Sequence, residues 1–206
     1  MNLRKATLLI ISILLIDQIS KIYIKTNFAL HDKVVVFDWF QIAFVENDGM
    51  AWGTKISDIV SFISDRSAKL ILTLFRIVAV IGIGYWLYIS ARIKSSKTLI
   101  FAIALIFAGA LGNIFDSVFY GVFFSDSHHQ VAQFLPKDGG YDTFFYGKVV
   151  DMLHFPMWSG VIPEWVPFYG GRYFTFFEPV FNVADIAIST GIAILIFFNK
   201  RAFKNH

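Results

Sequence analysis

Long runs of apolar residues recur four times along the chain, and few charged residues interrupt them. A helix of roughly 20 mostly apolar residues crosses a bilayer core of about 30 Å. The pattern therefore predicts a mainly α, polytopic membrane protein. Its four expected transmembrane helices cover about residues 6–24, 70–91, 98–120 and 182–198.

The first apolar run also has the hydropathy of a secretory signal peptide. Its apolar core is followed by the polar and charged residues Asp17, Gln18 and Lys21. A cleavage site would need small residues at this point. We therefore expect the run to be retained as a helix.

Two long connections, at about residues 25–69 and 121–181, join these helices, and neither is a polar loop. Residues 31–47 mix β-branched and aromatic residues with partial alternation, which is typical of one or two short strands. The later connection carries Trp158 and Trp165 among further aromatic rings, which favour the headgroup zone of a membrane. We expect a small sheet and loops on the membrane surface, and no separate soluble domain.

On one side of the membrane, the segments that flank the predicted helices carry basic residues and no acidic ones. The basic residues before the first helix, between the second and third, and after the fourth are Arg4, Lys5, Arg92, Lys94, Lys97, Lys200, Arg201 and Lys204. All 15 acidic residues lie between Asp17 and Asp185. By the positive-inside rule, both termini and the short connection face the cytoplasm, and the two long connections face outward.

Composition narrows the possible chemistry. Hydrophobic residues make up 56% of the chain and charged residues 16%, whereas soluble domains average about 45–50% apolar and about 25% charged residues. A soluble globule, a disordered chain and a nucleic-acid partner are therefore not expected. The chain has no cysteine, which excludes a disulfide scaffold and a thiol nucleophile.

Sequence signatures of metal and nucleotide sites are also missing. His128 and His129 are adjacent and His154 stands apart, so no zinc-type spacing occurs. No GxSxG, Walker or GxGxxG motif is present. We expect neither a metal nor another cofactor.

Ionisable residues within or beside the apolar runs are the remaining candidates, because a charge in the membrane is costly unless it is paired or hydrated. Asp17 and Lys21, four residues apart, share one helix face and can pair. This pair suits a structural role, with substrate positioning as the alternative. Asn113 and Asp116, three residues apart, also share a face, and this arrangement fits polar helix packing as well as function.

Two aspartates come from separate outward-facing segments. Asn182 can cap the fourth helix with Asp185 at its third position, and such a capping box would need no function. Asp151 lies in an apolar stretch, where a hydrogen-bonded structural acid is common. Together, however, Asp151 and Asp185 could form a paired-carboxylate site that activates water. A rival interpretation is a small membrane transporter or lipid-binding assembly factor that uses the same acids as proton carriers.

Five motifs in chain order resemble those of bacterial lipoprotein signal peptidase, also called signal peptidase II. They are DQISK at 17–21, VENDGMAWG at 45–53, GALGNIFDS at 109–117, GKVVDM at 147–152 and FNVADIAIS at 181–189.

The resemblance implies a four-helix aspartyl endopeptidase with a small extracytoplasmic β-cradle, a single integral membrane domain over residues 1–206. It implies a monomer of the bacterial inner membrane that contacts membrane lipids. It also implies that the enzyme cuts prolipoproteins just before the diacylglyceryl-modified cysteine of the lipobox. The implied catalytic residues are Asp151 and Asp185, the substrate-binding residues are Asn47, Gly49, Asn113, Asp116 and Asn182, and the positioning residues are Asp17 and Lys21.

The chain departs from the family pattern in two places. Ser117 stands where the family has an arginine after the aspartate, and we expect Arg76 or Lys148 to supply the missing positive charge. A long segment, residues 121–146, separates the third helix from the GKVVDM motif. We expect this segment to be a surface loop and not a second active element.

Overall fold

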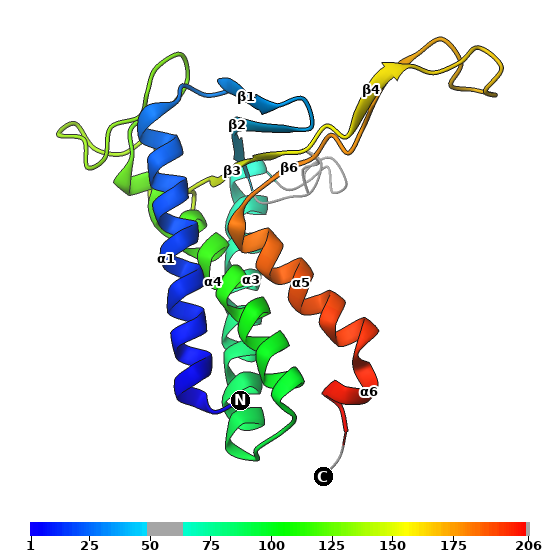
Figure 1. Cartoon of the computed structure of the whole chain (residues 1–206). Helices are drawn as coiled ribbons and strands as arrows, with labels where there is room; N and C mark the ends of the chain where they lie inside the picture. Colours follow the sequence, from blue (N-terminus) through cyan, green and yellow to red (C-terminus); the bar gives the residue numbers. More distant parts are fainter. Residues whose placement is uncertain (49–63, 205–206) are drawn as a thin grey trace.

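A computed structural model describes residues 1–48 and 64–204 of the chain, and four long helices dominate it (Figure 1). Three of them are long and apolar enough to cross a membrane, as predicted. The fourth, α5, has 15 residues and is therefore about 22 Å long, shorter than a bilayer core. A short helix, α6, follows it. The helices are α1 (Leu3–Asn27), α3 (Asp65–Arg92), α4 (Lys97–Phe123), α5 (Val183–Phe197) and α6 (Asn199–Ala202).

The three long helices extend beyond the apolar runs because polar residues cap their first turns. Asn2 Oδ1 accepts a hydrogen bond from the Lys5 amide at 3.0 Å. Ser64 and Ser96 play the same part at the starts of α3 and α4. A side-chain oxygen at this position satisfies an amide that has no partner within the helix.

In the part of the chain that the structure describes, six short strands form two antiparallel sheets. The larger sheet has the order β1-β2-β3-β6, and β4 pairs only with β5. Its first two strands confirm the strands expected in residues 31–47. The strands are β1 (Lys33–Phe37), β2 (Phe40–Asn47), β3 (Val149–His154), β4 (Trp158–Val161), β5 (Tyr173–Phe176) and β6 (Val180–Phe181).

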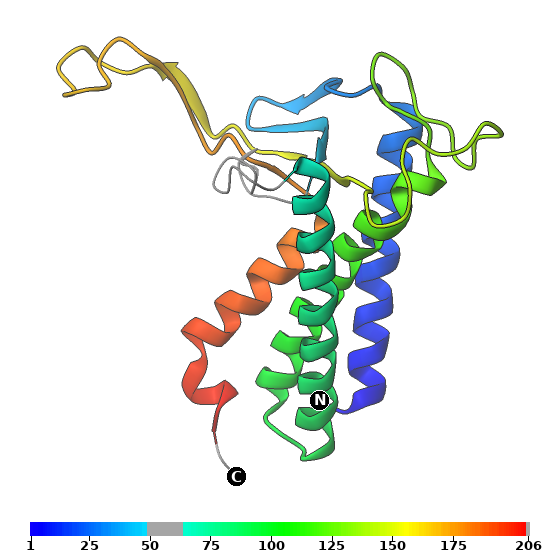
Figure 2. The same ribbon diagram turned by 180° about the vertical axis from the view of Figure 1, so that it is seen from behind.

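The larger sheet lies at one end of the helices, and the N-terminus, the α3–α4 turn and α6 lie at the other end (Figures 1 and 2). The β4–β5 hairpin extends away from the helices as an arm. Its aromatic side chains are exposed, including Trp165 and Phe168.

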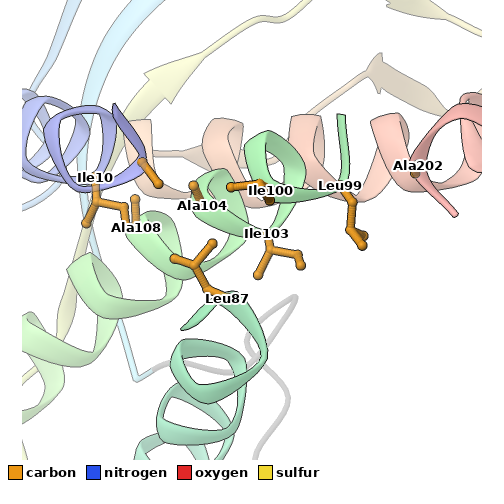
Figure 3. Close-up of a cluster of buried hydrophobic side chains, with 9 residues drawn as sticks. Ile10, Leu87, Leu99, Ile100, Ile103, Ala104, Ala108 and Ala202 are labelled. Carbon is orange, nitrogen blue, oxygen red and sulfur yellow. The ribbon is translucent and has the colours of Figure 1, made fainter. Parts of the chain in front are cut away.

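Two buried apolar clusters hold these layers together. One joins α1, α3, α4 and α6 through residues such as Ile10, Leu87 and Ile103 (Figure 3). The other lies beneath the sheet, where Phe44 and Val150 pack against aromatic residues of α4. The second cluster fixes the sheet to the end of the helices.

The segment 121–146 begins with the last residues of α4 and continues from residue 124 as a loop that is mostly exposed, as expected. Three residues of the loop, Phe124, Ser127 and Ala132, are nevertheless buried. Ala132 packs in the cluster beneath the sheet, and Ser127 is fully buried. The Leu30 amide donates to the Ser127 carbonyl at 3.1 Å. The loop is therefore fixed to the chain that follows α1.

Glycines allow α4 and α5 to approach each other closely. A Cβ atom at Gly109 would collide with the carbonyl oxygen of Ala184, and one at Gly191 would come within 2.7 Å of the carbonyl oxygen of Ala102. Small residues permit such contacts between membrane helices. This contact brings the start of α5 against the middle of α4.

Replacing Gly109 with alanine is expected to destabilise the fold. The added methyl group meets backbone, which cannot rotate away, and overpacking of this kind costs about 1–3 kcal/mol. Thermal unfolding in detergent should show a lower melting temperature. Gly82→Ala is the matched control, because a Cβ at this helical position would meet nothing within 4 Å. Equal melting temperatures for the two variants would contradict the prediction.

Candidate active site

Strand β3 presents Asp151 on the face opposite to its core residues. Alternation along the strand sends Val150 and Met152 into the cluster beneath the sheet. The Asp151 carboxylate accepts one hydrogen bond from Asn182 Nδ2 at 2.7 Å and another from Asn47 Nδ2 at 3.2 Å. Only 4% of this aspartate is exposed. Two asparagines therefore hold an almost buried carboxyl group.

Asp185 stands at the third position of α5, in the capping box expected from the sequence. The Asp185 amide donates to Asn182 Oδ1 at 2.9 Å, and the Asn182 amide donates back to Asp185 Oδ2 at 3.2 Å. The other carboxylate oxygen, Oδ1, accepts a bond from Asn113 Nδ2 at 2.8 Å. Both oxygens of Asp185 thus face oriented donors.

Asn182 brings the two aspartates to one place. Its side chain donates to Asp151, and its backbone amide donates to Asp185. Burial, and then the negative charge of Asp185, raise the pKa of Asp151 to about 7. Near neutral pH Asp151 can therefore hold a proton.

Behind this pair, Lys21 binds three oxygen atoms from two helices. Its ammonium lies 2.9 Å from Asp17 Oδ2, 2.7 Å from Asp116 Oδ2 and 2.8 Å from Asn113 Oδ1. The first contact confirms the predicted pairing of Asp17 with Lys21. Asp17 also accepts a bond from the Ala184 amide, in the first turn of α5, at 2.9 Å. The cluster thus ties α1, α4 and α5 together.

The structure places Asp116 differently from the substrate contact expected for it. Asp116 is fully buried, and its carboxylate accepts bonds from Lys21 and Gln18. A side chain with no accessible surface cannot touch a substrate in this conformation. Its bonds connect it to Asn113 through Lys21, so its contact with the site is indirect. Gly49 was also expected to contact the substrate, and it lies outside the residues that the structure describes.

A second buried ion cluster, which the sequence did not indicate, lies at the end of β2. Glu46 pairs with Lys25, accepts a hydrogen bond from Ser127 Oγ at 2.9 Å and lies 3.2 Å from Lys148 Nζ. Burial alone would raise the pKa of Glu46, but the two lysines hold it below its ordinary range. Glu46 directly precedes Asn47. The cluster therefore fixes the strand end that carries one partner of Asp151.

The two cations expected to replace the missing arginine have different surroundings. Lys148 is engaged with Glu46 and lies over the Tyr141 ring. Arg76, half-buried on α3, interacts electrostatically with Asp185. Ser117 itself is buried, and its hydroxyl donates to the Asn113 carbonyl at 3.0 Å. Arg76 is therefore the better candidate of the two for a charge that acts on the aspartate pair.

Within residues 1–48 and 64–204, no three histidine, aspartate or glutamate side chains are grouped so that they could hold a metal ion. The side chains that donate hydrogen bonds to the aspartate pair are the amides of Asn47, Asn113 and Asn182. Such donors bind and orient carbonyl and carboxylate oxygens.

Comparison with known proteins finds relatives that match most of the chain. The family model of signal peptidase (SPase) II matches residues 9–200. A lipoprotein signal peptidase of Porphyromonas gingivalis (strain W83) is 49% identical over 192 residues, which cover 91% of this chain and 79% of the relative. One of Amoebophilus asiaticus (strain 5a2) is 36% identical over 191 residues, covering 91% and 73%.

Solved structures support the same fold. One bacterial membrane enzyme superposes with a TM-score of 0.60 at 22% sequence identity, covering 99% of this chain and 93% of the other. A second gives a TM-score of 0.58 at 22% identity and covers 96% and 93%.

Proposed function

Because the chain belongs to the signal peptidase II family and removes signal peptides from prolipoproteins, we propose that Asp151 and Asp185 are its catalytic pair. One observation carries this proposal. Asn182 binds both carboxyl groups, which come from β3 and α5, and the pKa of Asp151 is raised to about 7. Two carboxyl groups that share a site and one proton are the apparatus of an aspartic peptidase.

The mechanism follows from these protonation states. Ionised Asp185 takes a proton from water as the water oxygen attacks the scissile carbonyl carbon, and protonated Asp151 donates a hydrogen bond to the developing oxyanion. Asp185 then gives its proton to the leaving nitrogen as the C–N bond breaks. The start of α5 favours a negative charge on Asp185, because helix amides at that end carry partial positive charge.

The surrounding polar residues divide into two groups. Asn47 and Asn113 have partly exposed amide groups at the aspartate pair, where they can also bind the substrate backbone. Asn182, expected to bind substrate, is fully buried like Asp116, and its role is to hold the two aspartates together. Asp17, Lys21 and Asp116 are positioning residues that hold Asn113 and the first turn of α5. This assigns Asp116 to the ion cluster instead of to substrate binding.

The chain is a membrane protein of the bacterial inner membrane. We propose that both termini lie in the cytoplasm, because the basic flanks lie at the end of the helices opposite the larger sheet (Figure 1). We also propose that the chain works as a monomer and as a single domain. The diacylglyceryl chains of the substrate would then remain in the outer leaflet while its peptide lies against the sheet. The transporter alternative is not favoured, since Asp151 lies in β3 and Asp185 in the first turn of α5, and both elements meet at one end of the bundle (Figure 1).

Cleavage of a diacylglyceryl-modified prolipoprotein peptide tests this function. Purified protein in detergent should cut just before the modified cysteine, and mass spectrometry of both products identifies the bond. The same peptide without its lipid is the matched control and should be cut much more slowly. Cleavage at another bond, or equal cleavage of both peptides, would contradict the proposed substrate.

The pH dependence of cleavage should report the proton on Asp151. Its raised pKa of about 7 means that Asp151 carries the proton below that pH and loses it above. Because the mechanism needs protonated Asp151, kcat/KM should fall about tenfold per pH unit on the alkaline side of pH 7. A pH profile on an uncharged peptide substrate measures this. An alkaline limb that begins well above pH 9 would contradict the assignment.

Arg76→Ala should lower cleavage more than Lys148→Ala does. The charge of Arg76 acts on Asp185, whereas Lys148 lies beside Glu46 and away from the pair. Removing one such charge is expected to lower kcat/KM by roughly tenfold, as measured in the same peptide assay. Lys137→Ala, at an exposed loop position, is the control. If both Arg76→Ala and Lys148→Ala cleave normally, no replacement cation acts at the site.

A further inference from the structure

The end of the molecule opposite the aspartates contains an open cavity. Its volume is about 1220 Å³, somewhat above the roughly 300–1,000 Å³ of ordinary ligand pockets. The N-terminus, the α3–α4 turn, α5 and α6 all contribute to its walls. None of the residues assigned to signal peptide cleavage lies there.

Positive charge dominates the polar part of this cavity. Its five basic residues are Lys5, Arg92, Lys94, Lys97 and Arg201. None of them forms an ion pair with a residue that the structure describes. The acidic residues of the chain lie between Asp17 and Asp185, and none of them lines the cavity. Five cations from three separate segments, the N-terminus, the α3–α4 turn and α6, thus face one space without a counter-charge from its walls.

The remaining walls are apolar. Phe101 of α4, Ile194 of α5 and Phe198, between α5 and α6, line the cavity next to the basic side chains. Phe101 and Phe198 are also exposed in the helix bundle. A ligand that fills this space must therefore combine a negatively charged group with an apolar part.

We infer that this cavity binds one anionic phospholipid of the membrane leaflet on that side, with its phosphate among the basic residues and its acyl chains along the apolar wall. Basic pockets between membrane helices recognise anionic headgroups in this way. Free phosphate would satisfy the charges but leave the apolar wall uncovered. The lipid satisfies both parts, and the site is separate from signal peptide cleavage.

Lipid binding to the purified full chain tests the inference. Native mass spectrometry and lipid-dependent melting temperature would be measured in neutral detergent, with phosphatidylglycerol and with phosphatidylcholine of the same acyl chains. We expect one retained phosphatidylglycerol and a higher melting temperature with that lipid alone. Millimolar glycerol 3-phosphate should not displace it. Equal binding of the two lipids, or displacement by glycerol 3-phosphate, would overturn the inference.

Two triple variants separate a specific site from diffuse surface charge. Lys5→Gln/Arg92→Gln/Lys97→Gln removes three cations that line the cavity. Arg4→Gln/Lys200→Gln/Lys204→Gln removes three from the same end that do not line it. The first variant should bind phosphatidylglycerol roughly 100-fold more weakly, and the second should bind it like the natural chain. Equal losses in both variants would contradict a defined site.

Correct folding of each triple variant is checked independently of the lipid. Peptide cleavage and the lipid-free melting temperature should match those of the natural chain, because the replaced residues are exposed and far from the aspartate pair. If a triple variant misfolds, the single variants of its residues serve in its place. A loss of phosphatidylglycerol binding with cleavage intact supports the lipid site even if the proposed catalytic pair is wrong.

Discussion

Asp151→Asn and Asp185→Asn are each expected to lower kcat/KM by roughly 10²–10⁴-fold, the range typical for loss of a general acid or base. Asparagine keeps nearly the same shape, so Asn182 and Asn113 stay close to their places. It cannot, however, carry the transferred proton. The double variant should be little worse than either single variant, since two groups that act as one unit do not contribute independently.

Initial rates of lipopeptide cleavage measure this effect, and melting temperatures show whether the variants fold. Asp138→Asn, an exposed aspartate in the loop after α4, is the control and should cleave normally. If either single variant at the site keeps more than about a tenth of the activity, the proposed pair is wrong.

Lys21→Met should destabilise the protein more than any other single change proposed for it. The substitution leaves Asp17 and Asp116 fully buried without their cation. Removing one partner of a buried ion pair costs about 3–5 kcal/mol, because the remaining charge stays unpaired in the protein interior, where the dielectric constant is low. The free energy of unfolding in mixed micelles measures the loss.

A rescue experiment distinguishes this electrostatic cause from a packing defect. The triple variant Lys21→Met/Asp17→Asn/Asp116→Asn removes the stranded charges as well as the lysine. It should recover most of the lost stability, since neutral groups in a buried site cost less than unpaired ions. If the triple variant is no more stable than Lys21→Met alone, buried charge is not the reason for the loss. Lys137→Met, at an exposed position, controls for the change of residue type.

The apolar pattern predicted most of the helical frame because the membrane imposes a length and a composition on each spanning segment. It underestimated the helices at their ends, where Asn2, Ser64 and Ser96 extend them beyond the apolar runs. Local spacing also predicted the capping box of Asn182 and Asp185 and the pair of Asp17 and Lys21, and the structure confirms both.

Contacts between distant parts of the chain were harder to predict. The second ion cluster joins residues that are 21 to 102 positions apart in the sequence, namely Lys25, Glu46 and Ser127. No periodicity or spacing in the sequence indicates that these residues are in contact. The burial of Asp116 has the same origin, since its partner Lys21 comes from another helix. The motifs thus identified polar residues near the aspartate pair. Only the packing of α1 against α4 shows which of them, such as Asp116, belong to the buried ion cluster and which, such as Asn113, contact the pair.

The double role of Asn182 links enzymatic competence to assembly. The same residue starts α5 and bonds to both aspartates, and Gly109 must accept the first turn of α5 for those bonds to form. A newly inserted chain whose last helix is not yet seated has its two acids on separate, unconnected segments. With Asp151 and Asp185 as the proposed catalytic pair, such a chain would lack a complete site, so cleavage would begin only after α5 has packed against α4.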